Sequence, residues 1–178
     1  MAKTKWVLDP THSEVGFKIK HLMITNVSGS FGKFESTVEA EGDDFSLAEI
    51  AFSADIASIT TGNEQRDGHL QAPDFFDTAK YPQLIFKGTK LTAPDADGNM
   101  ELTGDLTMRD VTNSVKLAVE FGGIAKDPWG NTKAGFSING KINRKDFGLV
   151  WNAATETGGV LLSEDVRLHA EVQFVKQP

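Results

Sequence analysis

Apolar and polar residues alternate along most of this chain. Between Glu14 and Lys20, Val15, Phe17 and Ile19 share one phase, and charged residues occupy much of the other. The same alternation returns over residues 50–56, 102–108, 115–121, 134–142 and 166–174. A period of two with one polar face is typical of half-buried strands in an antiparallel sheet. The pattern therefore predicts an all-β protein.

The number of alternating segments sets the architecture. About eight strands with one apolar face must close on themselves or stack as two sheets to bury that face. The segment 26–42 changes phase between Phe31 and Phe34, and Gly32 lies at the change, which predicts a bulge or bend that curls the sheet. We expect an antiparallel barrel of about eight strands, whose interior is either filled by side chains or holds one small ligand.

One region, from Thr61 to Tyr81, loses the alternation. Thr61 and Glu64 have the spacing of a capping box, which predicts a short helix over about residues 63–71. The chain shows no internal repeat, low-complexity tract or linker, so we expect residues 1–178 to form a single domain.

Composition excludes several classes of function. The 178 residues contain no cysteine, which excludes a disulfide scaffold, a thiol nucleophile and any cysteine-ligated metal. A net charge of −7, spread along the chain, argues against a nucleic-acid partner. We expect no integral membrane segment, and a cytoplasmic location for the chain as written, because its start lacks the apolar region of a signal peptide. An engineered start would make a periplasmic or secreted location the alternative.

Motifs for common chemistry are absent from the sequence. The four histidines show no metal-ligand spacing, and a surface or hydrogen-bonded role is the ordinary interpretation. No nucleophile elbow, phosphate loop or dinucleotide fingerprint occurs, and the close carboxylate pairs lie in polar turns that favour capping roles. We therefore expect no metal, no cofactor and no catalytic residues.

Phenylalanine dominates the aromatic residues and lies mostly on the inward phase. Of 16 aromatic residues, 12 are Phe, a side chain with a large apolar area and no polar group. Such rings suit the wall of a cavity for an alkyl or prenyl chain, and they equally suit a filled core. Composition by itself favours the filled core and leaves the cavity open.

The segment 61–81 combines polar and aromatic residues. Arg66 and His69 lie on the expected helix, and the Phe75-Phe76 pair follows it. A helix of this kind could be a lid at a barrel mouth, with Arg66 or His69 meeting a polar headgroup. The alternatives are a plug helix with solvated charges, and a surface contact of Arg66 with Asp67 or Asp77.

Almost the whole chain resembles the YceI-like, polyisoprenoid-binding family. The resemblance rests on six blocks in the expected order, which are Trp6–Met23, Ile59–Leu70, Asp74–Pro82, Gly104–Thr112, Asp127–Asn131 and Ala134–Asn152. It implies an extended, lipocalin-like antiparallel barrel with an interior tunnel for a long amphiphile. Members of the family are commonly exported, and this sequence departs from that pattern by lacking a signal peptide.

The resemblance favours a non-enzymatic carrier or sequestering protein. The expected ligand is a long-chain isoprenoid, quinone-like or fatty-acid-like lipid, and the oligomeric state is left open, a homodimer included. The rival interpretations are an enzyme acting on such a lipid, with His21, His69 and Arg66 near the reactive end, and a structural interaction domain with a filled core. Seventeen residues are candidates for ligand binding: Phe17, Ile19, His21, Phe31, Phe34, Phe52, Ile56, Arg66, His69, Phe75, Phe76, Phe86, Leu106, Met108, Phe121, Phe136 and Trp151.

Overall fold

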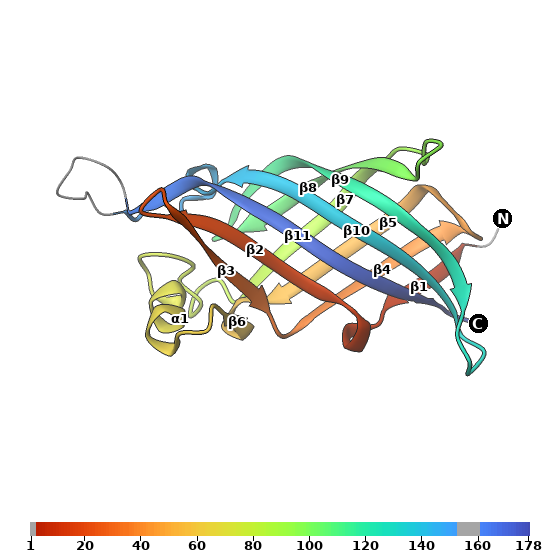
Figure 1. Cartoon of the computed structure of the whole chain (residues 1–178), viewed down its shortest axis with the longest axis horizontal. Helices are drawn as coiled ribbons and strands as arrows, with labels where there is room; N and C mark the ends of the chain where they lie inside the picture. The colour runs from red at the N-terminus through yellow and green to blue at the C-terminus, as the bar shows by residue number, and fades with distance from the viewer. Residues whose placement is uncertain (1–2, 153–160) are drawn as a thin grey trace.

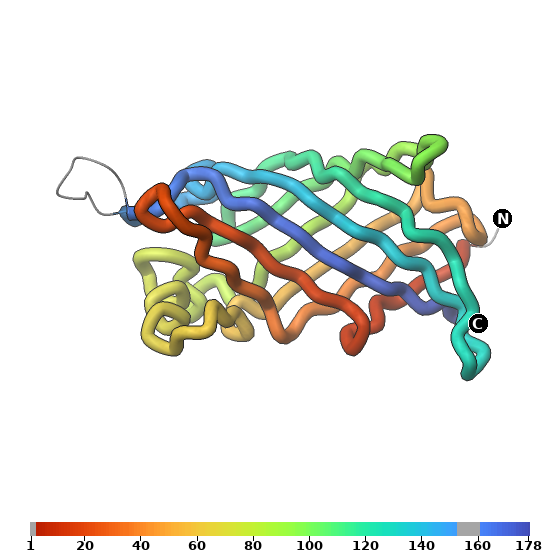
Figure 2. Tube along the Cα trace, viewed as in Figure 1, coloured from red at the N-terminus to blue at the C-terminus, as the bar shows by residue number. Residues whose placement is uncertain are grey.

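The computed structural model describes residues 3–152 and 161–178, and most of them lie in long strands (Figures 1 and 2). The strands are β1 (Thr4–Leu8), β2 (Glu14–His21), β3 (Thr25–Phe31), β4 (Phe34–Glu41), β5 (Asp44–Asp55), β6 (Ile59–Thr60), β7 (Gln83–Leu91), β8 (Asn99–Met108), β9 (Val111–Lys126), β10 (Thr132–Asn143) and β11 (Leu162–Lys176). The helices are α1 (Glu64–Gln71) and the 3₁₀ turns η1 (Pro10–His12), η2 (Ile56–Ser58) and η3 (Arg144–Phe147).

Eight of the strands close into an antiparallel barrel. Their order is β1-β4-β5-β7-β8-β9-β10-β11, and β1 closes the ring because it pairs with both β4 and β11. Trp6 on β1 lies opposite Val38 of β4 and Lys176 of β11. The prediction of an all-β, antiparallel barrel of about eight strands with one short helix is confirmed.

The remaining strands, β2, β3 and β6, lengthen the barrel at one end. β2 continues along β11 beyond β1, so that Leu8 faces Phe174 and Val15 faces Ala170 on the same strand. β3 pairs with β2, and β6 pairs with β3. The chain bends between β3 and β4, where the Gly32 N–H donates to the Ser58 carbonyl at 3.1 Å, as the phase change predicts.

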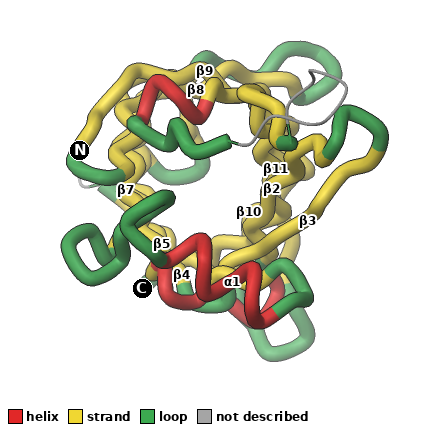
Figure 3. The backbone as a smooth tube through the Cα atoms, turned by 90° about the vertical axis from the view of Figure 1, so that its left-hand side faces the viewer, coloured by secondary structure: helices red, strands yellow, loops and turns green. Residues whose placement is uncertain are grey.

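Helix α1 lies at the same end of the barrel, away from the two termini (Figure 1), and this end faces the viewer in Figure 3. Its N-cap is Asn63, whose side-chain oxygen accepts the Arg66 N–H at 3.0 Å. The expected capping box is therefore wrong in detail: the Thr61 hydroxyl instead donates to the Asp67 carboxylate at 2.6 Å. Gly62, with φ of +81°, turns the chain between Thr61 and the helix. Asn63 follows this turn and therefore occupies the N-cap position of the helix.

An aromatic cluster fills the opposite end of the barrel. Trp6 is fully buried against Phe45 at 5.2 Å between ring centroids, and Phe45 also contacts Phe121 at 5.8 Å and Phe136 at 5.2 Å. Phe174 contacts Phe136 at 6.1 Å. We call these five residues the aromatic plug. Because they come from β1, β5, β9, β10 and β11, their packing also ties the closed ring together.

Candidate functional site

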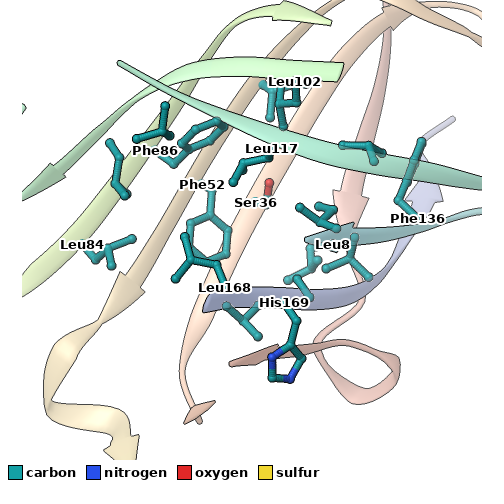
Figure 4. Close-up of a pocket in the computed structure, with 18 of the residues that line it drawn as sticks. Leu8, Ser36, Phe52, Leu84, Phe86, Leu102, Leu117, Phe136, Leu168 and His169 are labelled. Carbon is teal, nitrogen blue, oxygen red and sulfur yellow. The ribbon is translucent and has the colours of Figure 1, made fainter. Parts of the chain in front are cut away.

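A first cavity of about 180 Å³ lies inside the barrel next to the aromatic plug. Its wall is formed almost entirely by inward aliphatic and aromatic side chains, including Phe52, Phe86, Leu102 and Leu117 from adjacent strands (Figure 4). The aliphatic Leu8 and Leu168 belong to the same wall. The inward phase of the sequence therefore lines an internal space as well as a packed core.

The polar groups of this first cavity are already engaged or turned away. Ser36 is buried, and its hydroxyl donates to the Ala51 carbonyl at 2.7 Å. The His169 imidazole points away from the apolar side chains (Figure 4), over Gly16 of the neighbouring strand. Neither group offers a free partner to a polar ligand atom, so this half of the site suits a hydrocarbon chain.

A second cavity of about 240 Å³ lies on the α1 side of the first. Its wall combines strand residues such as Ile19 and His21 with Arg66 and His69 of α1, and with Trp151 from the segment after η3. Strands, a helix and loops thus converge on one space. This convergence places side chains together that are far apart in the sequence.

The two cavities adjoin each other. Six residues line both of them, namely Phe17, Phe31, Leu84, Met108, Ile142 and Leu168. We call these six residues the neck. Every member of the neck is apolar, so the passage between the two cavities presents no polar barrier to an alkyl or prenyl chain.

A glycine fixes the position of one neck ring. Gly29 on β3 faces Phe17 on β2, and a Cβ at Gly29 would lie 2.3 Å from Phe17 Cζ. The Phe17 ring therefore lies over the glycine backbone, where any larger residue would displace it towards the channel. The missing side chain of Gly29 is part of what keeps the neck open.

His69 is held in an aromatic sandwich at the second cavity. Its ring lies edge-on to both Phe75 and Trp151, with centroids 5.0 Å away in each case. Its Nε2 lies 3.3 Å from the Asp74 carboxylate. These contacts join α1, the segment that follows it and the segment after η3 into one wall.

The Arg66 side chain is exposed, and it already donates hydrogen bonds to Thr61, just before the start of α1. Its Nε donates to the Thr61 hydroxyl at 2.7 Å, and its Nη2 donates to the Thr61 carbonyl at 2.8 Å. The alternative that paired Arg66 with the carboxylate of Asp67 or Asp77 is not the arrangement seen. Asp67 shares Thr61 with Arg66, since the Thr61 N–H donates to its carboxylate at 2.8 Å.

Arg144 is the most deeply buried charged residue among those described, with 2% of its surface exposed, and it lines the second cavity. Its Nε donates to the Ser163 carbonyl at 2.8 Å, and its Nη1 donates to the carbonyls of Leu149 at 2.6 Å and Trp151 at 2.8 Å. Burial lowers the pKa of Arg144 from its usual value, and the charge of Glu164 partly opposes this. The guanidinium remains a cation at physiological pH.

The structure brings most of the candidate residues to these walls. Three of them lie outside both cavities. Phe34 stacks on Phe52 at 6.3 Å between ring centroids, Ile56 is fully buried in η2, and Phe121 belongs to the aromatic plug. All three follow the inward phase, but an inward side chain can reach packed core as well as cavity wall, and the sequence pattern does not separate the two.

The sequence interpretation also missed residues that line the site. Leu84 and Leu168 belong to the neck, and Arg144 belongs to the second cavity. A signal for Arg144 was present, because it continues the inward phase of Phe136, Ile138 and Ile142 along and just beyond β10. An arginine on an apolar phase is uncommon enough to mark a special role.

Within residues 3–152 and 161–178, no three His, Asp or Glu residues form a group that could hold a metal ion. No helix within these residues has the length and apolar character needed to cross a bilayer.

The fold and cavities define a class, that of closed antiparallel barrels with an apolar interior channel. The chain matches the model of the YceI-like domain over residues 6–174. It is 38% identical to a UPF0312 protein of Staphylococcus aureus strain N315 over 172 residues, which cover 96% of this chain and 97% of the relative. The chain belongs to the YceI-like family.

Solved structures show the same fold. A Campylobacter jejuni YceI protein is 38% identical with a TM-score of 0.75, and the alignment covers 96% of each chain. A polyisoprenoid-binding domain from Saccharophagus degradans, implicated in plant cell wall breakdown, is 15% identical with a TM-score of 0.66 and covers 97% of this chain and 98% of that one. At that identity the second likeness concerns the fold alone.

Proposed function

We propose that this protein binds a long-chain isoprenoid, or a similar quinone-like or fatty-acid-like amphiphile, and carries or sequesters it inside the barrel. The observation that supports this most directly is the apolar neck shared by two adjoining cavities. Each cavity is smaller than the roughly 300–1,000 Å³ of common ligand pockets, and the two in series reach that range. A slender chain that passes the neck fits such a space better than a bulky ligand.

The energetics favour a ligand with many apolar carbons. Burial is worth about 0.8 kcal/mol for each CH₂ group before ordering costs are subtracted. A chain of several isoprene units therefore needs no charged contact to bind tightly. The Saccharophagus degradans domain, which is described as polyisoprenoid-binding, supplies the chemical class of the proposed ligand.

Two neighbouring residues provide a matched test of this function. Leu84 faces the neck, whereas Ile85, the next residue on β7, is 44% exposed on the outer face. Leu84→Trp should obstruct the passage, and Ile85→Trp should add the same ring to the surface. Because extra volume inside a barrel can cost about 1–3 kcal/mol, the folded fraction of both variants is measured first.

The readouts are the lipids that copurify and the binding of geranylgeraniol. Organic-solvent extracts of each purified protein are analysed by mass spectrometry, and the affinity for geranylgeraniol is measured by titration. We expect the wild type and Ile85→Trp to hold lipid and to bind the alcohol, and Leu84→Trp to lose both. A wild type that neither carries lipid nor binds geranylgeraniol, or a folded Leu84→Trp that binds as well as the wild type, would overturn the proposal.

A further inference from the structure

The buried guanidinium of Arg144 has hydrogen-bonding capacity that the protein does not use. Nε and Nη1 donate to three backbone carbonyls, from Ser163, Leu149 and Trp151. Nη2, by contrast, is buried and has no hydrogen-bond partner in the part of the chain that the structure describes. An arginine carries five N–H donors in a planar fork, so two donors are left without an acceptor.

The charge of Arg144 is also uncompensated at close range. Within residues 3–152 and 161–178, no carboxylate forms an ion pair with it. Glu164 acts on Arg144 only through its charge, and its carboxylate is paired with Lys145 Nζ at 2.8 Å. A buried cation with free donors is costly unless an acceptor, preferably an anionic one, is supplied.

Arg144 lies where the polar end of an amphiphile would be. It lines the second cavity, beyond the neck from the apolar first cavity. A ligand whose tail passes the neck towards the aromatic plug leaves its headgroup in the second cavity. The same wall holds Trp151, whose carbonyl is fixed by Nη1, so the guanidinium is anchored before any ligand arrives.

We propose that Arg144 recognises an anionic oxygen, of a carboxylate or a phosphate, at the polar end of the bound amphiphile. This inference rests on the proposed function and adds the headgroup chemistry to it. Nη2 donates to the headgroup oxygen, while Nε and Nη1 keep their carbonyl partners. Charge-assisted hydrogen bonds to a planar fork are stronger than neutral ones, so the site prefers the anion to the parent alcohol.

Arg66, which is exposed at the surface, is the alternative residue for this role. It lines the same cavity, but two of its nitrogens already donate to Thr61 and its side chain is exposed. Solvent screens an exposed cation, so Arg66 discriminates less between an anionic and a neutral head. The two arginines therefore make different predictions for the same pair of ligands.

The test compares three probes with one chain length, geranylgeranyl phosphate, geranylgeranoic acid and geranylgeraniol. For the wild type we expect the phosphate or the acid to bind at least tenfold more tightly than the alcohol, and the comparison of the two anions identifies the head. Arg144→Met should abolish that preference while the alcohol still binds. Arg66→Met tests the rival residue and should keep the preference. Arg167→Met, at an exposed arginine that lines neither cavity, is the control and should also keep it.

Arg144→Met loses three hydrogen bonds to backbone carbonyls and can fail to fold, so a second measurement uses the wild type. The chain has four arginines, Arg66, Arg109, Arg144 and Arg167, and their guanidinium groups are distinguishable by NMR with ¹⁵N-labelled arginine. The acid or the phosphate should shift the Arg144 signals strongly and those of Arg109 and Arg167 little.

The outcomes separate this inference from the function on which it rests. Equal affinities for anion and alcohol with unshifted Arg144 signals overturn the Arg144 assignment and leave chain binding in the cavity standing. Loss of the anion preference in Arg66→Met also overturns it, in favour of Arg66. Failure of all three probes to bind the wild type overturns the proposed function and the headgroup assignment together.

Discussion

The two halves of the channel are built in different ways. The first cavity is enclosed by regular strands and ends at the aromatic plug, whereas the second is enclosed by strand ends, α1 and the segment after η3. In the first half the polar groups are satisfied or turned outward, as Ser36 and His169 show. In the second half, Nη2 of Arg144 is buried and has no hydrogen-bond partner in the described part of the chain. Under the proposed function, the first half would take the hydrocarbon tail of the ligand and the second half its polar head.

The largest expected effect on stability distinguishes a residue packed in the aromatic plug from a residue that lines the cavities. Trp6→Ala removes a fully buried ring from the plug and should lower the free energy of unfolding by about 3–5 kcal/mol. Phe17→Ala removes a ring that faces both cavities, so fewer contacts are lost, and about 1–2 kcal/mol is expected. Urea unfolding of both variants measures the difference. Equal losses would mean that Phe17 is packed like the plug.

A second prediction concerns pH and the turns at the plug end. The Asp9 carboxylate accepts hydrogen bonds from the Thr11 hydroxyl at 2.7 Å and from Lys133 Nζ at 2.9 Å, and it lies 2.8 Å from His12 Nδ1. These contacts, that of Thr11 most of all, hold the pKa of Asp9 well below its ordinary value of 3.8. The folded state therefore binds fewer protons than the unfolded state. The stabilisation is present above pH 3.8 and is lost as the pH falls from there through the lower pKa of the folded protein.

Asp9→Asn should remove about 2 kcal/mol of this stability at neutral pH. Unfolding of both proteins is measured at pH 7 and at pH 3, where the gap between them should narrow. Lipid binding should not change, because Asp9 lines neither cavity. A variant that matches the wild type at both pH values would show that the Asp9 contacts contribute no net stability.

Chain length tests whether the two halves form one channel. Geraniol, farnesol and geranylgeraniol differ by one isoprene unit each, and each unit buries further apolar carbons. We expect each step to tighten binding about tenfold, or ~1.4 kcal/mol, until the channel is full. If affinity stops rising after the shortest alcohol, only one cavity is used and the neck is not passed.

The smallest effect is expected at α1. Asn63→Ala removes the N-cap acceptor for the Arg66 N–H and should destabilise the helix by about 1 kcal/mol. Because α1 lies at the rim of the second cavity, amide exchange should quicken in α1 while the strands around the plug stay protected. Uniformly faster exchange in both regions would mean that α1 does not open separately from the barrel.

Much of the barrel could be predicted from the sequence, because a strand's alternation depends only on its own residues. The inward phases around Phe17, Phe52 and Phe136 follow from the period of two, and the bend at Gly32 follows from the phase change. The helix over residues 63–71 was predicted within one residue, but its cap was not, because Thr61 is engaged by Arg66 and Asp67 instead.

The sequence by itself thus determined which side chains face inward, and the tertiary structure decided which of them meet a void. Phe121 and Phe17 share the same inward character, yet the packing of five strands places Phe121 in the plug and Phe17 in the neck. The unused donors of Arg144 depend on carbonyls from Leu149, Trp151 and Ser163, which reach it through loop paths that no local pattern specifies. Phase is a local property of the chain, whereas a cavity and a free hydrogen-bond donor are defined only by everything that surrounds them.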